Sequence, residues 1–290
     1  MTLCKIPVFS IPLLSMDKTS NRKSAGAQTV TRAFELVDLF DDQHRIWSLG
    51  DLIKASGLKR TTVFRLMTSL EEVGIVRKRS QGGYILGERL IALGGRAMRA
   101  NPLRTVARPF MEQLSALTTE STILDTLLVL DSRPKSMVVE EVQGHHLLGL
   151  AQHIGSHFPA HSTSTGKVLL AYQSAKNLAA LDLTNLTQFT QFTITDTDRL
   201  LAELADVRQA GYATAIGELA IGMMAIAAPI FDMHGEVVAA LTISASESRV
   251  SAEKLHTFAD PLKKAAQNIS RQIGYEPSVV TGDGGTRGGF

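Results

Sequence analysis

Residues 57–74 read GLKRTTVFRLMTSLEEVG, and the fold of the N-terminal part of the chain follows from this stretch. Its apolar residues recur at the spacing of one face of an α-helix, and they are Val63, Leu66, Met67, Leu70 and Val73. A glycine stands at each end, as is typical where a helix follows a tight turn and where it stops. The pattern predicts a helix that buries this apolar side and leaves a polar side of arginines and threonines.

A shorter helix is predicted immediately before this stretch. Ser48 is a typical N-cap for LGDLIKAS (49–56), and Asp51 stands at the third helical position as a capping-box partner. Gly57 tolerates the positive φ of a tight turn, and a valine and a leucine follow it by six and nine positions. This spacing predicts a helix-turn-helix, in which the two apolar residues pack the second helix against the first. Ile53 stands where a small residue is more usual.

The flanking segments predict a winged module with a connector. Residues 28–41 carry an apolar helical face, made of Val30, Ala33, Phe34, Val37 and Phe40. Two extended runs, IVRKR and YILG, are joined by Ser80-Gln81-Gly82-Gly83, which predicts a hairpin. ERLIALGGRAMRA (88–100) predicts a connecting helix before Pro102.

Residues beyond 102 predict a second domain built from hairpins and helices. Strands are predicted over 121–131, 135–144, 147–152, 223–232 and 236–245. Helices are predicted over 104–118, 162–173, 196–211 and 251–274, the last as one long closing helix. The irregular order of these elements indicates an α+β fold with a largely antiparallel sheet flanked by helices.

The 290 residues are thus divided into five segments. We expect a disordered tail (1–26), a winged helix-turn-helix domain (27–88), a linker helix (89–102), a second domain (103–275) and a glycine-rich disordered tail (276–290). The apolar start, MTLCKIPVFSIPLLS, contains two prolines and no cleavage site before Asp17, so it does not resemble a signal peptide. A true start at Met16 rather than Met1 is an alternative to a tail.

Composition indicates a globular protein of the cytoplasm. Hydrophobic residues make up 44% and charged residues 20% of the chain. The single cysteine, Cys4, excludes a disulfide framework or a cysteine-based zinc site within one chain, which fits a reducing compartment. No apolar run reaches 18 residues, so we expect no membrane span.

Positive charge is concentrated around the predicted helix-turn-helix. The chain carries a net charge of +2, but residues 52–81 hold seven basic and two acidic residues, seven minus two or +5, which leaves −3 for the remainder. Arginine can bind guanine through two hydrogen bonds, and threonine can contact phosphate or a thymine methyl group. A basic hairpin beside the helix suits a wing that lies over phosphates, whereas an ordinary solvated basic helix is the alternative. The predicted DNA contacts are Ser48, Lys59, Arg60, Thr61, Thr62, Arg65, Thr68, Arg77, Lys78 and Arg79.

Five of the eight histidines fall in HHLLGLAQHIGSHFPAH. Spacings of four between His153, His157 and His161 could place metal ligands on one helix face, but Gly155 and Pro159 interrupt such a helix. We therefore expect pocket or surface histidines, and neither a metal nor a cofactor. The next segment, GSHFPAHSTSTGK (155–167), delivers four hydroxyl residues to a predicted helix start, which is suited to a carboxylate or another small anion.

From 27 to 275 the chain resembles the IclR-type transcriptional regulators. TVTRAFELVDLF resembles their first helix, SLGDLIKASGLKRTTVFRLMTSLEEVGIVRK their helix-turn-helix, and GGYILGERLIALG their wing and linker helix. GSHFPAHSTSTGKVLLA and GYATAIGELAIGMMAIAAPIFDMHGEVVAALTIS resemble the two signature stretches of their effector-binding domain. The motifs stand in the order of the family, and together they are specific.

The resemblance implies a ligand-responsive regulator of a catabolic operon, a repressor or an activator rather than an enzyme. It implies a homodimer or homotetramer that binds double-stranded operator DNA, and a C-terminal domain similar to GAF and PAS folds. By position, it implies that a small-molecule effector contacts Leu150, Phe158, Ser164, Thr165, Met223, Ala225, Thr242 and Ser244.

Two positions depart from the family pattern. Members often carry a cysteine at the position of Ala225 and an acidic residue at that of Ala215. Both changes make the pocket less polar, which favours a larger or more apolar organic acid, such as an aromatic acid, over the usual small oxo-acid. Two alternatives stay open: a DNA-binding structural protein with an inert C-terminal domain, and an enzyme in which His161 or His153 acts as acid or base.

Overall fold

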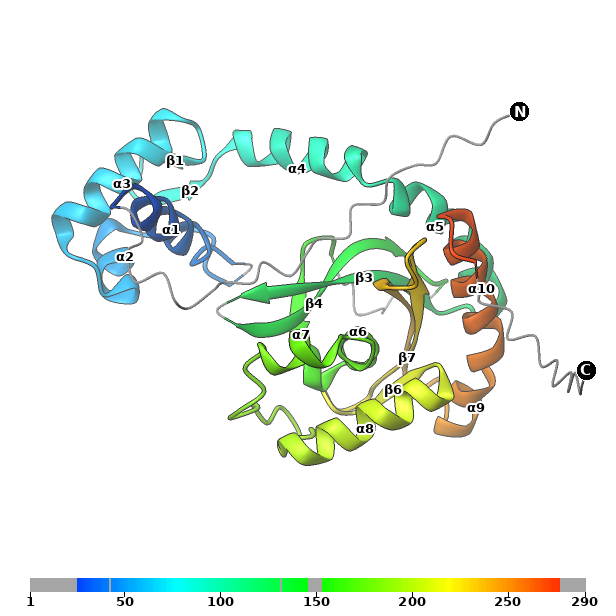
Figure 1. Cartoon of the computed structure of the whole chain (residues 1–290). Helices are drawn as coiled ribbons and strands as arrows, with labels where there is room; N and C mark the ends of the chain where they lie inside the picture. The colour runs from blue at the N-terminus through cyan, green and yellow to red at the C-terminus, as the bar shows by residue number, and fades with distance from the viewer. Residues whose placement is uncertain (1–24, 42, 131, 146–152, 277–290) are drawn as a thin grey trace, which may run out of the picture. The chain divides into compact units, whose positions relative to one another are not determined.

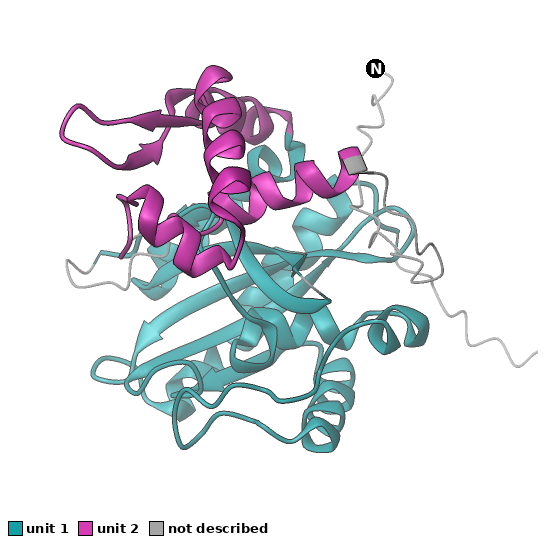
Figure 2. Ribbon diagram, turned by 90° about the vertical axis from the view of Figure 1, so that its left-hand side faces the viewer, with its two compact units in different colours: residues 1–15, 101–290 teal, residues 16–100 magenta. Residues whose placement is uncertain are grey.

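The computed structural model describes residues 25–41, 43–130, 132–145 and 153–276 (Figure 1). The chain divides into two compact units, and the boundary falls between Ala100 and Asn101 (Figure 2). In chain order, the first unit is the one drawn in magenta and the second unit the one drawn in teal. Most of the two predicted tails and the predicted strand over 147–152 lie outside the described residues. Within the described part of the chain, no helix is both long and apolar enough to cross a membrane.

The first unit is a winged helix-turn-helix followed by a long helix. Its elements are α1 (Ala25–Val37), α2 (Leu49–Ser56), α3 (Arg60–Glu72), β1 (Val76–Lys78), β2 (Tyr84–Leu86) and α4 (Glu88–Ala100). β1 and β2 pair antiparallel as the wing. Val63, Leu66 and Met67 of the 57–74 stretch are buried as predicted and Leu70 packs beside them, whereas Val73 is 46% exposed. They belong to the core that joins the helices to the wing, whose buried members are Leu36, Leu52, Val63, Leu66, Met67, Val76 and Tyr84.

The turn between α2 and α3 is formed by Gly57. Its φ is 65°, a left-handed conformation that glycine adopts without a steric penalty, and its amide donates to the carbonyl of Ile53 at 3.2 Å. At the other end of α2, the Ser48 hydroxyl accepts from the Asp51 amide at 3.1 Å. These two caps fix both ends of α2, as the sequence predicts.

Helix α1 differs from its prediction in extent and in the face it buries. It ends at Val37 rather than at residue 41, and the Asp41 carboxylate caps the following turn by accepting from the amides of Gln43 and His44. Leu36 is fully buried, whereas Val30 and Phe34 are each 58% exposed. Of the predicted face, Ala33 and Phe40 pack against the core and Val30 and Phe34 do not, so the buried side is centred on Leu36.

The second unit contains a six-stranded sheet in the order β5-β4-β3-β8-β7-β6, and every neighbouring pair is antiparallel. The strands are β3 (Ser121–Leu130), β4 (Arg133–Val142), β5 (His157–Pro159), β6 (Ala213–Ile216), β7 (Met223–Phe231) and β8 (Val237–Ser246). Its helices are α5 (Pro102–Thr118), η1 (Ala160–Ser162), α6 (Ser164–Ala171), α7 (Ala175–Ala179), α8 (Thr197–Ala210), α9 (Ala252–Thr257) and α10 (Ala259–Gln272). The α+β fold with an antiparallel sheet is confirmed.

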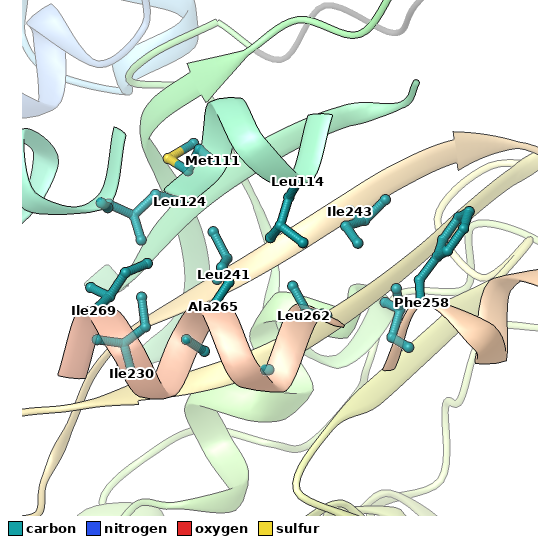
Figure 3. Packing of buried hydrophobic residues seen from close by; sticks show 14 of the residues in the cluster. Met111, Leu114, Leu124, Ile230, Leu241, Ile243, Phe258, Leu262, Ala265 and Ile269 are labelled. Atoms are coloured by element: carbon teal, nitrogen blue, oxygen red, sulfur yellow. The ribbon is translucent and has the colours of Figure 1, made fainter. Parts of the chain in front are cut away.

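Helices cover both faces of this sheet, so it has two apolar cores. Leu241 and Ile243 of β8 pack against α5 and α10 (Figure 3). Ala240 faces the opposite side, where α6 and α8 pack. Because side chains alternate along a strand, Thr242 and Ser244 also lie on the α6 side. The pleat of β8 thereby turns two hydroxyl groups toward the start of α6.

The predicted closing helix over 251–274 is wrong as a single helix, because it is divided at Phe258 into α9 and α10. Pro261 lies in the first turn of α10. It has no amide hydrogen, and in a continuous helix its ring would clash with the carbonyl of Thr257. The second helix instead begins afresh and packs Leu262, Ala266 and Ile269 into the core.

Candidate DNA interface and effector cavity

The first turn of α3 presents basic and hydroxyl side chains. Lys59, Arg60, Thr61 and Arg65 are exposed, while Val63 and Leu66 on the other side of the helix are buried. The N-cap, Lys59, makes no side-chain capping bond, and the first turn contains no acidic residue. The start of α3 therefore combines amide groups without helical partners and positive side chains, which suits a phosphate.

Apart from Ser48, the remaining predicted DNA contacts lie within α3 or on the wing. Arg77 and Lys78 are exposed on β1, and Arg77 forms an exposed ion pair with Glu88 at 3.5 Å. Thr62, Thr68 and Arg79 are partly buried, and Thr68 donates to the carbonyl of Phe64 at 3.0 Å. Phe64 itself is 54% exposed on the polar side of α3.

Ser48 is an exposed residue whose side chain already has two local partners. Besides accepting from the Asp51 amide, its hydroxyl donates to the Asp51 carboxylate at 2.7 Å. Glu71 is similarly used inside the module, since its carboxylate accepts from the Lys78 amide at 3.3 Å. This contact joins the end of α3 to the wing.

In the second unit a cavity with about 440 Å³ of empty space, opening included, lies between the start of α6 and the ends of β7 and β8. Seven of the eight predicted effector contacts line it, and they are Phe158, Ser164, Thr165, Met223, Ala225, Thr242 and Ser244. Leu150, the eighth, lies outside the described residues. Ala215, where the family often has an acidic residue, also lines the cavity.

The structure adds lining residues that the motif comparison missed, and they are Ser162, Thr163, Glu218, Leu219 and Met224. Thr163 is the N-cap of α6, and its hydroxyl accepts from the Gly166 amide at 3.0 Å. Glu218 is the most polar of these residues. In the sequence, Glu218 could have been noticed as the single acidic residue of the apolar run ATAIGELAIGMM.

Glu218 belongs to a buried ionic cluster with Lys167. The Lys167 ammonium is 1% exposed and donates to Glu218 Oε1 at 2.9 Å and to Glu203 Oε1 at 2.8 Å. Burial raises the pKa of Glu218, and the charge of Lys167 opposes this shift. Lys167 is thus a structural cation under the cavity. Because its ammonium is paired with two carboxylates, Lys167 is not arranged like the phosphate-binding lysine of a P-loop.

No metal site is found among the histidines that the structure describes. His157 lies in β5 and His161 in η1, and the described residues contain no group of three or more metal-ligating side chains. His161 is buried and donates to the carbonyl of Thr187 at 3.0 Å, and burial lowers its pKa, so it is a neutral hydrogen-bond donor. His153 is exposed.

Comparison with protein families matches both units. Residues 29–80 match the IclR helix-turn-helix domain, and residues 95–271 match the family described as bacterial transcriptional regulator IclR C-terminal. Among characterised relatives, the HTH-type transcriptional regulator XynR of Escherichia coli is 31% identical over 250 residues, which cover 86% of this chain and 98% of XynR.

Solved structures show the same architecture. An IclR transcriptional regulator from Alicyclobacillus acidocaldarius is 26% identical with a TM-score of 0.74, and the match covers 85% of this chain and 99% of that one. An IclR homolog from Microbacterium hydrocarbonoxydans, solved in complex with 4-hydroxybenzoate, is 25% identical with a TM-score of 0.70, covering 84% and 98%.

Proposed function

Because the chain belongs to the IclR family of transcriptional regulators, we propose that α3 and the wing bind operator DNA and that the cavity beside α6 binds the effector. The family consists of DNA-binding regulators with a C-terminal effector-binding domain, so the protein is a regulator and not an enzyme. The main support for the proposal is that seven of the predicted effector contacts, which come from distant parts of the chain, line one cavity.

For the DNA interface, the exposure of Arg60, Thr61 and Arg65 supports contacts with base edges in the major groove of double-stranded operator DNA. Arg77 and Lys78 on the wing are placed to contact phosphates. Ser48 is proposed as a phosphate contact as well, and it would keep its capping bond while doing so. A regulator that binds operator DNA would act in the cytoplasm.

For the effector, the cavity supports an organic acid, aromatic acids included. The start of α6 provides helix amides, and Ser164 and Thr165 provide hydroxyl groups for a carboxylate. Ala215 and Ala225 leave the opposite wall apolar, which suits a ligand larger than a two- or three-carbon oxo-acid. Micromolar binding of glyoxylate or pyruvate in calorimetry would count against this ligand class.

For assembly, apolar side chains outside the cores support a homodimer or homotetramer. Helix α4 has no buried residue, and Ile91 is 76% exposed. Val30 and Phe34 of α1 are exposed in the same unit. Exposed apolar surface of this kind is typical of association surfaces. Light scattering on the full chain, with Ile91→Glu as a disruptive variant, measures the oligomeric state directly.

The test of function is a DNA mobility shift with the intergenic region upstream of the genes that neighbour this protein's own gene. We expect binding that changes when an effector acid is added, because a ligand that prefers one protein geometry shifts the equilibrium between geometries. Binding that no acid alters would favour the alternative of an inert C-terminal domain. The direction of the change decides between repressor and activator.

A further inference from the structure

Three residues that line the cavity each carry a buried polar atom without a hydrogen-bond partner among the described residues. The three atoms are Ser164 Oγ, Glu218 Oε2 and Thr242 Oγ1. Ser164 is 0%, Thr242 2% and Glu218 9% exposed. Buried polar groups are nearly always paired, so three unpartnered atoms around one cavity indicate that a ligand supplies the missing partners.

Glu218 differs from the two hydroxyl residues in what it can accept. A hydroxyl group can donate or accept, whereas an ionised carboxylate only accepts. Lys167 already occupies Oε1, and it divides its single charge between Glu218 and Glu203. With both glutamates ionised, two carboxylates around one cation leave excess negative charge, so a hydrogen-bond donor is favoured over a carboxylate as the ligand group opposite Oε2.

Hydrogen bonds fix the backbone at Gly217 and Glu218. Gly217 has a φ of 67°, and its amide donates to the carbonyl of Met223 at 2.7 Å. The hydroxyl of Thr193 donates to the Glu218 carbonyl at 2.6 Å, and that of Thr190 donates to the Gly217 carbonyl at 2.6 Å. These bonds hold the backbone that carries Glu218, and the bond from Lys167 to Oε1 holds its carboxylate, so Oε2 is the oxygen left for a ligand.

The start of α6 offers the complementary half of the site. Thr163 satisfies the Gly166 amide, but the first amides of a helix have no helical partner, and the free Ser164 hydroxyl lies beside them. These donors and the helix dipole favour a carboxylate. The cavity therefore joins an anion-binding end at α6 to an acceptor at Glu218.

We infer that Glu218 is a specificity-determining residue, which selects organic acids that carry a hydroxyl or amino group at a position remote from the carboxylate. The ligand's donor binds Oε2, and its carboxylate binds at Ser164 and Thr165. This inference rests on the proposed function of the cavity as the effector site. It narrows the ligand class from organic acids in general to acids with a second, donating group.

The first test uses the wild-type full chain and matched acids in calorimetry. Benzoate is compared with 4-hydroxybenzoate and 4-aminobenzoate, and propionate with 3-hydroxypropionate. We expect a donor-bearing acid to bind at least about tenfold more tightly than its plain counterpart, because only the donor satisfies the buried Oε2. Equal affinities among the benzoates and between the propionates would overturn the role of Glu218, but they would still support the cavity as a binding site for acids. Binding of no acid at all would overturn the proposed ligand class and this inference together.

The second test replaces Glu218 by glutamine. The amide oxygen of Glu218→Gln still accepts from Lys167, so its NH₂ group faces the cavity and donates instead of accepting. We expect the preference for the hydroxylated or aminated acid to disappear or reverse. Glu203→Gln is the matched control, since it changes the other carboxylate on Lys167 and should keep the wild-type preference. A Glu218→Gln protein that melts normally and keeps that preference would overturn the inference, and if it does not fold, the wild-type comparison still decides.

Discussion

The Arg249 guanidinium donates two hydrogen bonds to the Glu120 carboxylate, from Nε to Oε1 at 3.0 Å and from a terminal nitrogen to Oε2 at 2.8 Å. The two residues are 129 positions apart in the chain, and the Glu120 side chain is only 3% exposed. The pair joins the turn after β8 to the residue that precedes β3. The pair therefore links the two central strands, β3 and β8, at the end of the sheet where Ser121 pairs with Ser244.

We predict that Arg249→Ala strongly destabilises the second unit. Glu120 is buried and loses two charge-assisted hydrogen bonds, while Arg249 is partly exposed, so the loss in free energy of unfolding should be about 1.5–3 kcal/mol. Urea unfolding measures the loss. The surface pair of Arg133 and Asp182, 3.5 Å apart, is the control, and Arg133→Ala should cost less than about 1 kcal/mol. Similar losses in the two variants would contradict the difference in burial.

Asp125 gives a prediction on pH. Burial raises its pKa from 3.8 to about 7, so the folded state holds this proton more tightly than the unfolded chain does. Ionisation of Asp125 therefore costs the folded state almost no free energy below about pH 4. The cost rises as the pH approaches 7, and above that it reaches its full value, of the order of 4 kcal/mol.

Asp125→Asn removes that penalty, so its gain in unfolding free energy should be roughly 2–3 kcal/mol larger at pH 8 than at pH 5. Urea titrations at the two pH values check this. Asp182→Asn is the matched control, because the Thr184 hydroxyl lowers the pKa of that exposed carboxyl and its replacement should bring no gain at high pH. A pH-independent effect of Asp125→Asn would show that Asp125 does not titrate in this range.

Arg65→Ala tests the reading of bases by α3. If Arg65 contacts a base edge, the variant loses about 1–3 kcal/mol of binding free energy, and mostly at one operator position. Arg77→Ala on the wing should instead weaken binding on all sequences and reduce the salt dependence by about one unit of slope. Mobility shifts on a set of mutated operators, repeated at several salt concentrations, separate the two patterns. A uniform loss with Arg65→Ala would make Arg65 a phosphate contact.

Ser48→Ala separates capping from DNA binding. Loss of the bond to the Asp51 amide should lower the stability of the first unit by about 1 kcal/mol. The double variant Ser48→Asp with Asp51→Asn restores a capping oxygen without setting two carboxylates side by side, and it introduces a negative charge where a phosphate contact is proposed. We therefore expect it to rescue the melting temperature and not the DNA affinity. Rescue of both would remove Ser48 from the interface.

Local patterns were sufficient for most of the elements. The bounds of α2 follow from a capping serine and a left-handed glycine, and those of α4 from its helical residues before Pro102. Such signals act over a few residues, so they are visible in the chain itself. The closing helix shows the same principle, because Pro261 already marked the break that the long periodic pattern obscured.

Tertiary packing decided which side of a pattern is buried and which atoms meet. Val30 and Phe34 continue an apolar helical face, but only the neighbouring helices determine that Leu36 is the residue covered. Motif positions identified seven cavity residues, whereas Glu218 emerged only from the contact that brings it to Lys167, 51 residues away. The sequence by itself determined the helix-turn-helix, the antiparallel α+β domain and the family. The folded structure alone decided that Glu218 keeps one carboxylate oxygen free at the cavity, because the partners of a buried charge are set by long-range packing and not by neighbours along the chain.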